Sequence, residues 1–531
     1  MSEMKTLYLT IILISLCLLA AVIIDPVHAQ IGRVYFGSLQ PQMTTSGSNL
    51  DIIWQYWNPE RTVYTIASND SGTTLGDKIN LSKNSTTFFS FGNMATYGND
   101  IYYAWENNTL PYTPRLFLMK SNDSGLTFNK PVLIVSHDRY FNEVMELDKL
   151  LVSGNNVYVI WSTDRSVGSG DFGTIFLSKS TDGGLHFDRP IPINSNDTNW
   201  FDLETVTSGN KTYFLWQSIV NKTCILGRCD SQIHIRSTDK NDTLGDIFSP
   251  LILDKAEQVK ITASGDNVYL TGVIFEPNYT SITSNGLKIL TPVTSPEWIF
   301  FTKSTDGGAT FGNVVNLSGS RHYCNSSGTA WMCSLDDAYS YASGRDVYMI
   351  WDAENYTAND REAFFVSSVD GGNTFSKATK LHPFNLDGID CDHIERCINI
   401  QSPLESTDTV YLAWSAHGID QFRDATIFAK STDGGRTLDY YDITNSTGIA
   451  ASPVIAAGPG GIVYLAGTRS GFPEGSHAFF TKSTDGGNSF GKGTDLDLLP
   501  ESAAPEFPFA VPVLLFGIMS LIVFYRVKIR K

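Results

Sequence analysis

Carboxylates are the side chains of this sequence whose spacing could support chemistry. The densest group is Asp387, Asp390 and Asp392, three aspartates on one short acidic segment. Three carboxylates this close together suit a hard cation such as calcium, which prefers oxygen ligands. Their spacing matches no standard calcium loop, so a solvated acidic loop is the alternative. Calcium is the one cofactor that the sequence suggests.

Further acidic residues stand at the starts of expected strands. They are Glu146, Asp148, Asp202, Glu204, Asp336 and Asp337. Paired carboxylates could serve glycoside hydrolysis, although loose acidic pairs are common in an acidic chain. The formal net charge is −17. A nucleic-acid partner is therefore not expected, because such partners require a basic surface.

One pattern, Ser-x-Asp-x-Gly-x-Thr-Phe, recurs along nearly the whole chain, and we call it the repeated turn. The clearest copies run over residues 304–311 and 368–375, and the copy at Asp239 is decayed because Asn241 replaces the glycine. Successive aspartates are 52 to 67 residues apart, a period typical of propellers and solenoids. The eight aspartates are Asp70, Asp123, Asp182, Asp239, Asp306, Asp370, Asp433 and Asp485.

A second motif precedes each repeated turn, as in Val157-Tyr158-Val159-Ile160-Trp161. It is apolar on both alternating faces, so it predicts a strand that is covered on both sides. Each unit then reads as four strands, and four-stranded units repeated radially form a β-propeller. We therefore predict an all-β fold, a propeller of eight blades. Seven blades stay open because the first and fourth repeats are weak.

The repeated turn has a physical role of its own. Its aspartate can accept turn N–H groups, and its glycine supplies a backbone conformation that other residues avoid. We therefore interpret these aspartates as structural and not as a catalytic pair.

These repeats resemble the Asp-box, or bacterial neuraminidase repeat, superfamily over roughly residues 30–500. That superfamily includes sialidases, other glycoside hydrolases, sorting receptors and assembly factors, so the resemblance implies the propeller and leaves the function open. Its sialidases have six blades and a Phe/Tyr-Arg-Ile-Pro motif, which is not found here. Gly32-Arg33-Val34-Tyr35 is the nearest early arginine. No catalytic residue carries over, so the catalytic residues stay unknown.

Both ends of the chain indicate export and anchoring. Residues 1–29 read as a signal peptide, with a retained anchor as the alternative. Residues 501–508 form a linker with Pro505-Glu506-Phe507, residues 509–525 are an uncharged transmembrane stretch, and residues 526–531 form a basic cytoplasmic tail. This tail resembles archaeal PEF-type sorting signals, and a plain single-pass anchor is the alternative. Either arrangement places residues 30–500, the propeller, on the outer face of the cell membrane.

Six cysteines remain after the signal, and an even number in an exported chain favours disulfides. The simplest pairing is local: Cys224 with Cys229, Cys324 with Cys333, and Cys391 with Cys397. Glycosylation sequons also recur, as expected for a surface glycoprotein. Candidate acceptors are Asn80, Asn84, Asn107, Asn196, Asn221, Asn278, Asn325, Asn355 and Asn445.

The long loops are expected on the face opposite the repeated turns. They include residues 162–173, 217–231, 273–297, 318–334 and 382–397. Long, disulfide-braced loops on one face suggest a binding surface. The leading hypothesis is thus a non-catalytic module of the cell surface that binds a glycan or an envelope protein. A sialidase-like exo-glycosidase and a structural envelope component are the alternatives.

Overall fold

The computed structural model describes most of the region between Gly37 and Ser502. The described residues are 37–38, 41–57, 62–83, 92–107, 115–136, 143–165, 173–194, 200–208, 211–219, 231–238, 244–253, 256–275, 278–284, 287–318, 322–325, 334–355, 360–381, 398–401, 408–416, 425–449, 451–471 and 475–502.

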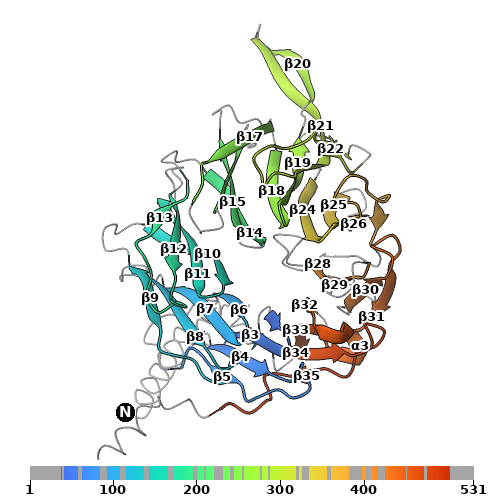
Figure 1. The fold of residues 1–531 in the computed structure, drawn as a ribbon. Helices are drawn as coiled ribbons and strands as arrows, with labels where there is room; N and C mark the ends of the chain where they lie inside the picture. Colours follow the sequence, from blue (N-terminus) through green and yellow to red (C-terminus); the bar gives the residue numbers. More distant parts are fainter. Residues whose placement is uncertain are drawn as a thin grey trace, which may run out of the picture.

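Eight four-stranded blades form a ring around a central axis (Figure 1). The prediction of an eight-bladed β-propeller is confirmed, and the seven-bladed alternative is wrong. The decayed fourth repeat still forms a blade because its strands keep the apolar pattern that buries them, even though its turn has lost the glycine.

The first four blades contain short, consecutive antiparallel strands. Blade 1 has β2 (Gln42–Ser46), β3 (Asn49–Trp57), β4 (Thr62–Ser68) and β5 (Ile79–Asn80). Blade 2 has β6 (Asn93–Tyr97), β7 (Asp100–Asn107), β8 (Arg115–Ser121) and β9 (Val132–Ser136). Blade 3 has β10 (Glu143–Ser153), β11 (Asn156–Arg165), β12 (Ile175–Ser180) and β13 (Ile191–Pro192). Blade 4 has β14 (Trp200–Ser208), β15 (Lys211–Ile219), β16 (Ser231–Ser237) and β17 (Phe248–Leu253).

The remaining blades follow the same order. Blade 5 has β18 (Ala256–Ser264), β19 (Asn267–Phe275), β21 (Leu287–Ser304) and β22 (Val315–Asn316). Blade 6 has β24 (Ser334–Ser343), β25 (Asp346–Asn355), β26 (Asp360–Ser368) and β27 (Thr379–Lys380). Blade 7 has β28 (Ile398–Gln401), β29 (Val410–Ala416), β30 (Ala425–Ser431) and β31 (Asp439–Asp442). Blade 8 has β32 (Ala451–Ala457), β33 (Val463–Gly471), β34 (Gly475–Ser483) and β35 (Thr494–Asp495).

The core lies between the blades, and the second strand of each blade is its centre. Every side chain from Val157 to Trp161 on β11 is at most 3 % exposed. One face of this strand packs against blade 2 and the other against blade 4. An apolar pattern without alternation is therefore the pattern that a strand covered on both faces requires.

The antiparallel order gives the ring two distinct faces. The hairpins between first and second strands and the repeated turns between third and fourth strands lie on one face, which we call the turn face. The connections from second to third strands and from blade to blade lie on the opposite face, which we call the loop face. The innermost strand of each blade therefore starts at the loop face.

Neighbouring blades are joined by contacts that recur around the ring. The tyrosine of one second strand lies beneath the glycine of the next repeated turn, and a Cβ placed on Gly487 would lie 3.4 Å from Cε1 of Tyr411. The lysine before one repeated turn bonds the next turn, as Lys303 Nζ does with the Gly371 carbonyl at 3.0 Å. Each repeated turn that the structure describes therefore orders its own blade and the junction with the preceding blade.

The same contacts close the ring between blades 8 and 1. Tyr464 lies beneath Gly72, and Lys482 Nζ donates to Ser71 O and Thr73 Oγ1, both at 2.8 Å. The two-residue strand β1 (Gly37–Ser38) pairs with both β3 and β34. Blades 1 and 8 thereby form one continuous sheet.

The segment after β35 continues over the outer edge of blade 1. Lys78 pairs with Glu501, its amide donates to Pro500 O at 2.9 Å, and Ser502 N donates to Lys78 O at 3.0 Å. Glu501 and Ser502 therefore belong to the propeller. The sequence assigned them to the linker because two residues without repeat character give no sign of a partner that lies far away in the chain.

The expected loop at residues 273–297 contains regular structure instead. β20 (Asn278–Ser284) pairs with the first part of β21, and this hairpin projects from blade 5 (Figure 1). β23 (His322–Asn325) pairs with β21 on its other side. Asn285-Gly286 separates the two hairpin strands in sequence, and this pair is a strong hairpin signal. The loop prediction overlooked it.

The described helical structure is limited to α3 (Thr444–Thr447) and a turn of 3₁₀ helix, η1 (Pro459–Gly461). No helix in this part of the chain is long and apolar enough to cross a membrane. The predicted signal at 1–29 and the predicted transmembrane stretch at 509–525 lie outside the described residues.

Candidate functional site

In each described repeated turn, groups of the turn donate hydrogen bonds to its own aspartate side chain. In the fifth turn Asp306 accepts hydrogen bonds from Ser304 Oγ at 2.6 Å, Thr310 N at 2.9 Å and Thr310 Oγ1 at 2.6 Å. These donors hold the pKa of the Asp306 carboxyl well below its usual range. A serine two residues earlier donates in the same way to Asp70, Asp123, Asp182, Asp370, Asp433 and Asp485. Asp239 lies outside the described residues.

Most other residues predicted for sites lie outside the described part of the chain. These are Asp387, Asp390, Asp392, Cys224, Cys229, Cys333, Cys391, Cys397, Asn84, Asn196 and Asn221. Cys324, Asn278, Asn325 and Asn355 lie on described strands, and their side chains are not described. The calcium site, the disulfides and these sequons therefore stay predictions.

Three glycosylation candidates have described side chains. Asn445 is exposed on α3, and Asn80 is partly exposed at the outer edge of blade 1. Asn107 is only 5 % exposed at the end of β7. Its burial disfavours a glycan there, since a glycan needs a surface position. The sequon alone could not show that Asn107 ends a buried strand.

The acidic residues expected at strand starts lie on the innermost strands of three blades. Glu146 and Asp148 are on β10, Asp202 and Glu204 on β14, and Asp336 and Asp337 on β24. Each of these strands has a break in register at this point, between Leu147 and Lys149 in β10. A β-bulge of this kind re-aims a side chain. The register breaks thus fall on the acidic positions of these three innermost strands.

Glu106 on β7 joins the carboxylates of β10, and sequence reasoning missed it. Its Oε2 accepts the amide of Leu147 at 2.9 Å, which ties blade 2 to the bulge of blade 3. Gln217 and Ser415 accept bulge amides of the next blades in the same manner, from Val259 and Ser452. All three residues directly follow the tryptophan of a second strand. The position after this tryptophan was the sequence signal that could have identified Glu106.

Burial raises the pKa of both Glu106 and Asp148. The pKa of Asp148 rises to about 8 because the group is desolvated and the charges of Glu146 and Glu106 lie nearby, although Ser162 donates a hydrogen bond that opposes the rise. Desolvation also raises the pKa of Glu106, although the hydrogen bond from the Leu147 amide opposes the rise. Asp148 is partly exposed as a residue, but its Oδ2 atom is buried without a hydrogen-bond partner. Glu146 is exposed.

We call Glu106, Glu146 and Asp148 the channel carboxylates. In blade 4 the charge of Glu204 is balanced by an ion pair, because Lys260 of blade 5 donates to its Oε1 at 2.7 Å. Among the acidic side chains that the structure describes at these positions, the channel carboxylates are the ones whose charges act on one another. Such a group can accept hydrogen bonds from hydroxyl or ammonium groups, or share a proton.

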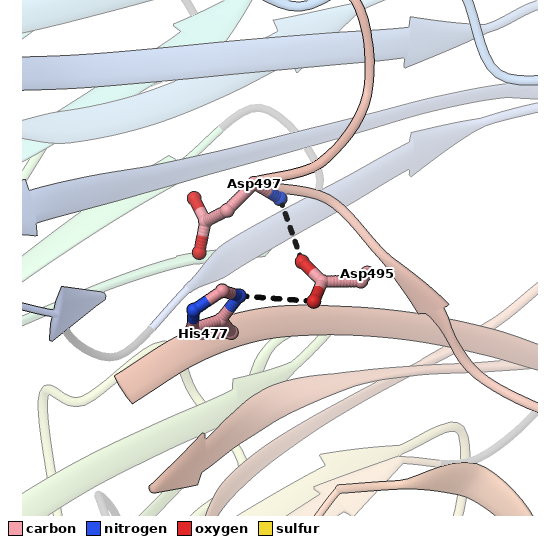
Figure 2. Close-up of side chains that lie close together, drawn as sticks. All are labelled: His477, Asp495 and Asp497. Carbon is pink, nitrogen blue, oxygen red and sulfur yellow. Dashed lines mark hydrogen bonds and ion pairs between the residues drawn. The ribbon is translucent and has the colours of Figure 1, made fainter. Parts of the chain in front are cut away.

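A second cluster lies between blades 8 and 1, and Figure 2 shows its three side chains. His477 comes from β34, Asp495 from β35 and Asp497 from the segment after β35. One possible ligand atom of each lies within 4.8 Å of the others, and this is the one such metal-type group among the described residues. His477 Nδ1 is 2.9 Å from Asp495 Oδ2, and Asp497 N donates to Asp495 Oδ1 at 3.0 Å.

Asp497 connects the two terminal blades. Its Oδ1 accepts the Trp54 indole of blade 1 at 2.8 Å, and its Oδ2 accepts the Ala478 amide of blade 8 at 2.9 Å. Lys78 donates to its main-chain oxygen. The sequence did not indicate this cluster, because the spacing from His477 to the two aspartates matches no local ligand pattern. Pairing of β34 with β35 brings the three residues together.

No protein-family model and no curated protein matches the sequence. Solved structures with propeller folds do match. A polysaccharide lyase, Uly1, has a TM-score of 0.41 at 11% identity over 74% of this chain and 89% of its own. A Hadza microbial sialidase has a TM-score of 0.34 at 11% identity over 74% and 77%. The GH74 enzyme of Niastella koreensis has a TM-score of 0.31 at 15% identity over 88% and 73%.

At such low identities and scores these likenesses do not bear on activity. The propeller is defined by the strand pairing of the chain itself. Any function has to be argued from the side chains.

Proposed function

We propose that this chain is a ligand-binding propeller of the cell surface, whose binding site is the loop-face end of the central axis around the channel carboxylates. The observation that carries the proposal is the grouping of Glu106, on the second strand of blade 2, with Glu146 and Asp148, on the innermost strand of blade 3. The aspartates that recur most often in the sequence are engaged in their own turns, so they are not available to a ligand.

A glycan fits this site better than a protein does. Exposed Glu146 can accept hydrogen bonds from sugar hydroxyls. The apolar ends of the chain fit an exported, membrane-anchored protein that meets surface polysaccharides. The Asp-box resemblance fits the same role, since the repeat builds propellers that hold varied sites.

The test is binding of the full-length protein, purified in mild detergent, to an array of surface polysaccharides and envelope proteins. We expect Glu146→Gln to weaken glycan binding about tenfold or more, because one charge-assisted hydrogen bond is lost. Asp439→Asn changes an exposed aspartate of blade 7 and serves as the control. Binding only to an envelope protein would favour the protein-ligand form of the proposal. Equal glycan binding by both variants would place the site elsewhere.

An exo-glycosidase of sialidase type is the second candidate, and one observation favours it. A raised pKa keeps Asp148 protonated near neutral pH, as a general acid requires, while Glu146 supplies a nearby carboxylate. Sugar release from fluorogenic glycosides, including a sialoside, distinguishes the two functions. Release that disappears in Asp148→Asn would establish the enzyme, and binding without release would establish the module.

A structural envelope component is the third candidate. It predicts ordered assembly of the purified protein without any small ligand. Electron microscopy of the protein at increasing concentration would reveal such assembly, whereas persistent single particles would argue against it.

A further inference from the structure

We propose that His477, Asp495 and Asp497 bind a divalent transition-metal ion that fastens the two ends of the ring. The site is separate from the channel carboxylates and does not depend on the proposed function. It lies on the outer strands where blade 8 meets the closing segment (Figure 2).

The donor set determines which metal fits. One imidazole and two carboxylates suit zinc and its first-row neighbours, whereas calcium prefers six to eight oxygen ligands. The cluster offers one imidazole nitrogen and two carboxylate oxygens, and these three atoms lie within 4.8 Å of one another. Three protein ligands leave a further position for water, as zinc accepts in its open sites.

One pair of atoms in the cluster already lies near the spacing of shared coordination. Two ligands that each lie about 2.1 Å from zinc are about 3 to 3.5 Å apart. His477 Nδ1 and Asp495 Oδ2 are 2.9 Å apart. An ion shared by these two atoms requires a shift of about a few tenths of an ångström, and the ligand atom of Asp497, which lies within 4.8 Å of the other two, would have to approach by up to about 1 to 2 Å.

The hydrogen bonds around the carboxylates support the site. Asp497 accepts the Trp54 indole on Oδ1 and the Ala478 amide on Oδ2, and Asp495 accepts the Asp497 amide on Oδ1. Ligating carboxylates in proteins are oriented by such outer hydrogen bonds. Here the donors come from both terminal blades, so metal binding and ring closure would be coupled.

The cluster is also shielded enough to hold an ion. The side chains of His477 and Asp495 are 18% and 19% exposed. His186 and Asp182 form a similar contact at 2.7 Å on the surface, with the histidine side chain 87% exposed. Among the described residues no third ligand completes that pair. The pair of His186 and Asp182 is therefore the control: a histidine–aspartate contact without a third metal ligand.

The test is zinc titration of full-length protein that has been stripped with a chelator, followed by calorimetry and thermal unfolding. We expect wild type and His186→Ala to bind one equivalent of zinc more than His477→Ala does. Zinc should raise the Tm of wild type and His186→Ala, because a ligand bound only by the native state stabilises it. Comparison between variants separates this site from any other zinc bound by the chain.

Asp495→Asn is the second variant, since its amide keeps acceptors and donors for the local hydrogen bonds while losing the charge. We expect it to fold, to bind one equivalent of zinc less and to show no zinc-dependent rise in Tm. Folding of each variant is checked by circular dichroism before titration. Equal zinc stoichiometry in wild type and Asp495→Asn, or no zinc binding by folded wild type, would overturn the proposal.

Discussion

The indole Nε1 of Trp54 donates a 2.8 Å hydrogen bond to Oδ1 of Asp497, although 443 positions separate the two residues. Trp54 is fully buried on the second strand of blade 1, and Asp497 follows the last strand of blade 8. The bond therefore joins the first and last blades. Every other junction of the ring connects blades that are consecutive in the chain, so this junction has the highest entropic cost of closure.

Trp54→Phe should loosen this junction in particular. The substitution removes one donor and leaves Asp497 Oδ1 without it, at a cost of about 1 to 3 kcal/mol. Trp161→Phe is the matched control, because its indole donates at 3.0 Å to Ser178 within blade 3. Both variants should lose stability, and only Trp54→Phe should speed hydrogen exchange in residues 475–502. Equal exchange in both variants would mean that the bond does not limit opening of the ring.

Asp51 should make stability depend on pH. It stands where the second strands of the other blades have tyrosine, and it is 2% exposed with Oδ1 buried and unpartnered. Burial raises its pKa to about 8. Between about pH 4 and pH 8 the unfolded chain has lost this proton while the native state keeps it. The native state therefore binds more protons, and its stability falls as the pH rises through this window.

Asp51→Asn should remove that slope. At pH 4 we expect the variant and wild type to be similarly stable, and near pH 8 the variant should be more stable by about 5 kcal/mol, because the pKa shift spans about four units of about 1.4 kcal/mol each. Urea unfolding across the window measures the difference. Asp439→Asn, at an exposed position, should leave the profile unchanged. A parallel profile for Asp51→Asn and wild type would show that Asp51 is not protonated in the native state.

Gly372 should tolerate alanine less well than Gly47. Both glycines have positive φ, at 75° and 58°, so alanine costs about 1 kcal/mol at either position. A Cβ on Gly372 would lie 2.6 Å from Cζ of Phe301 in the preceding blade, whereas nothing lies within 4 Å of one on Gly47. We expect a further loss of about 1 to 3 kcal/mol for Gly372→Ala from overpacking, measured by chemical denaturation. Equal losses would show that Phe301 can move aside.

Asp306→Ala should lower the Tm more than Asp439→Ala does. The first change removes three hydrogen bonds of a repeated turn, and the second removes an exposed side chain outside the turns. The lowered pKa of Asp306 means that its contribution is present above the ordinary aspartate range and is lost only as the pH falls through its folded value. Thermal unfolding at neutral and strongly acidic pH tests this, and equal Tm values at neutral pH would contradict it.

The repeats explain why the fold could be predicted. A repeated turn depends on residues within seven positions of one another, such as Ser304, Asp306 and Thr310. The segment Val157–Trp161 is apolar at every position, so its sequence alone predicts a strand that is buried on both faces. These signals are local, so eight copies of them determined the number of blades and the face on which the turns lie.

Other features depended on pairing between distant segments. Glu106 meets the carboxylates of β10 only because blades 2 and 3 pack side by side, and a bulge turns Asp148 into a desolvated position. His477 meets Asp495 and Asp497 because β34 pairs with β35, and Asp497 meets Trp54 only because the ring closes. By itself the sequence determined the propeller, through local turn chemistry and burial. The tertiary structure decided which carboxylates share an environment, because that depends on blade contacts and ring closure that no local pattern encodes.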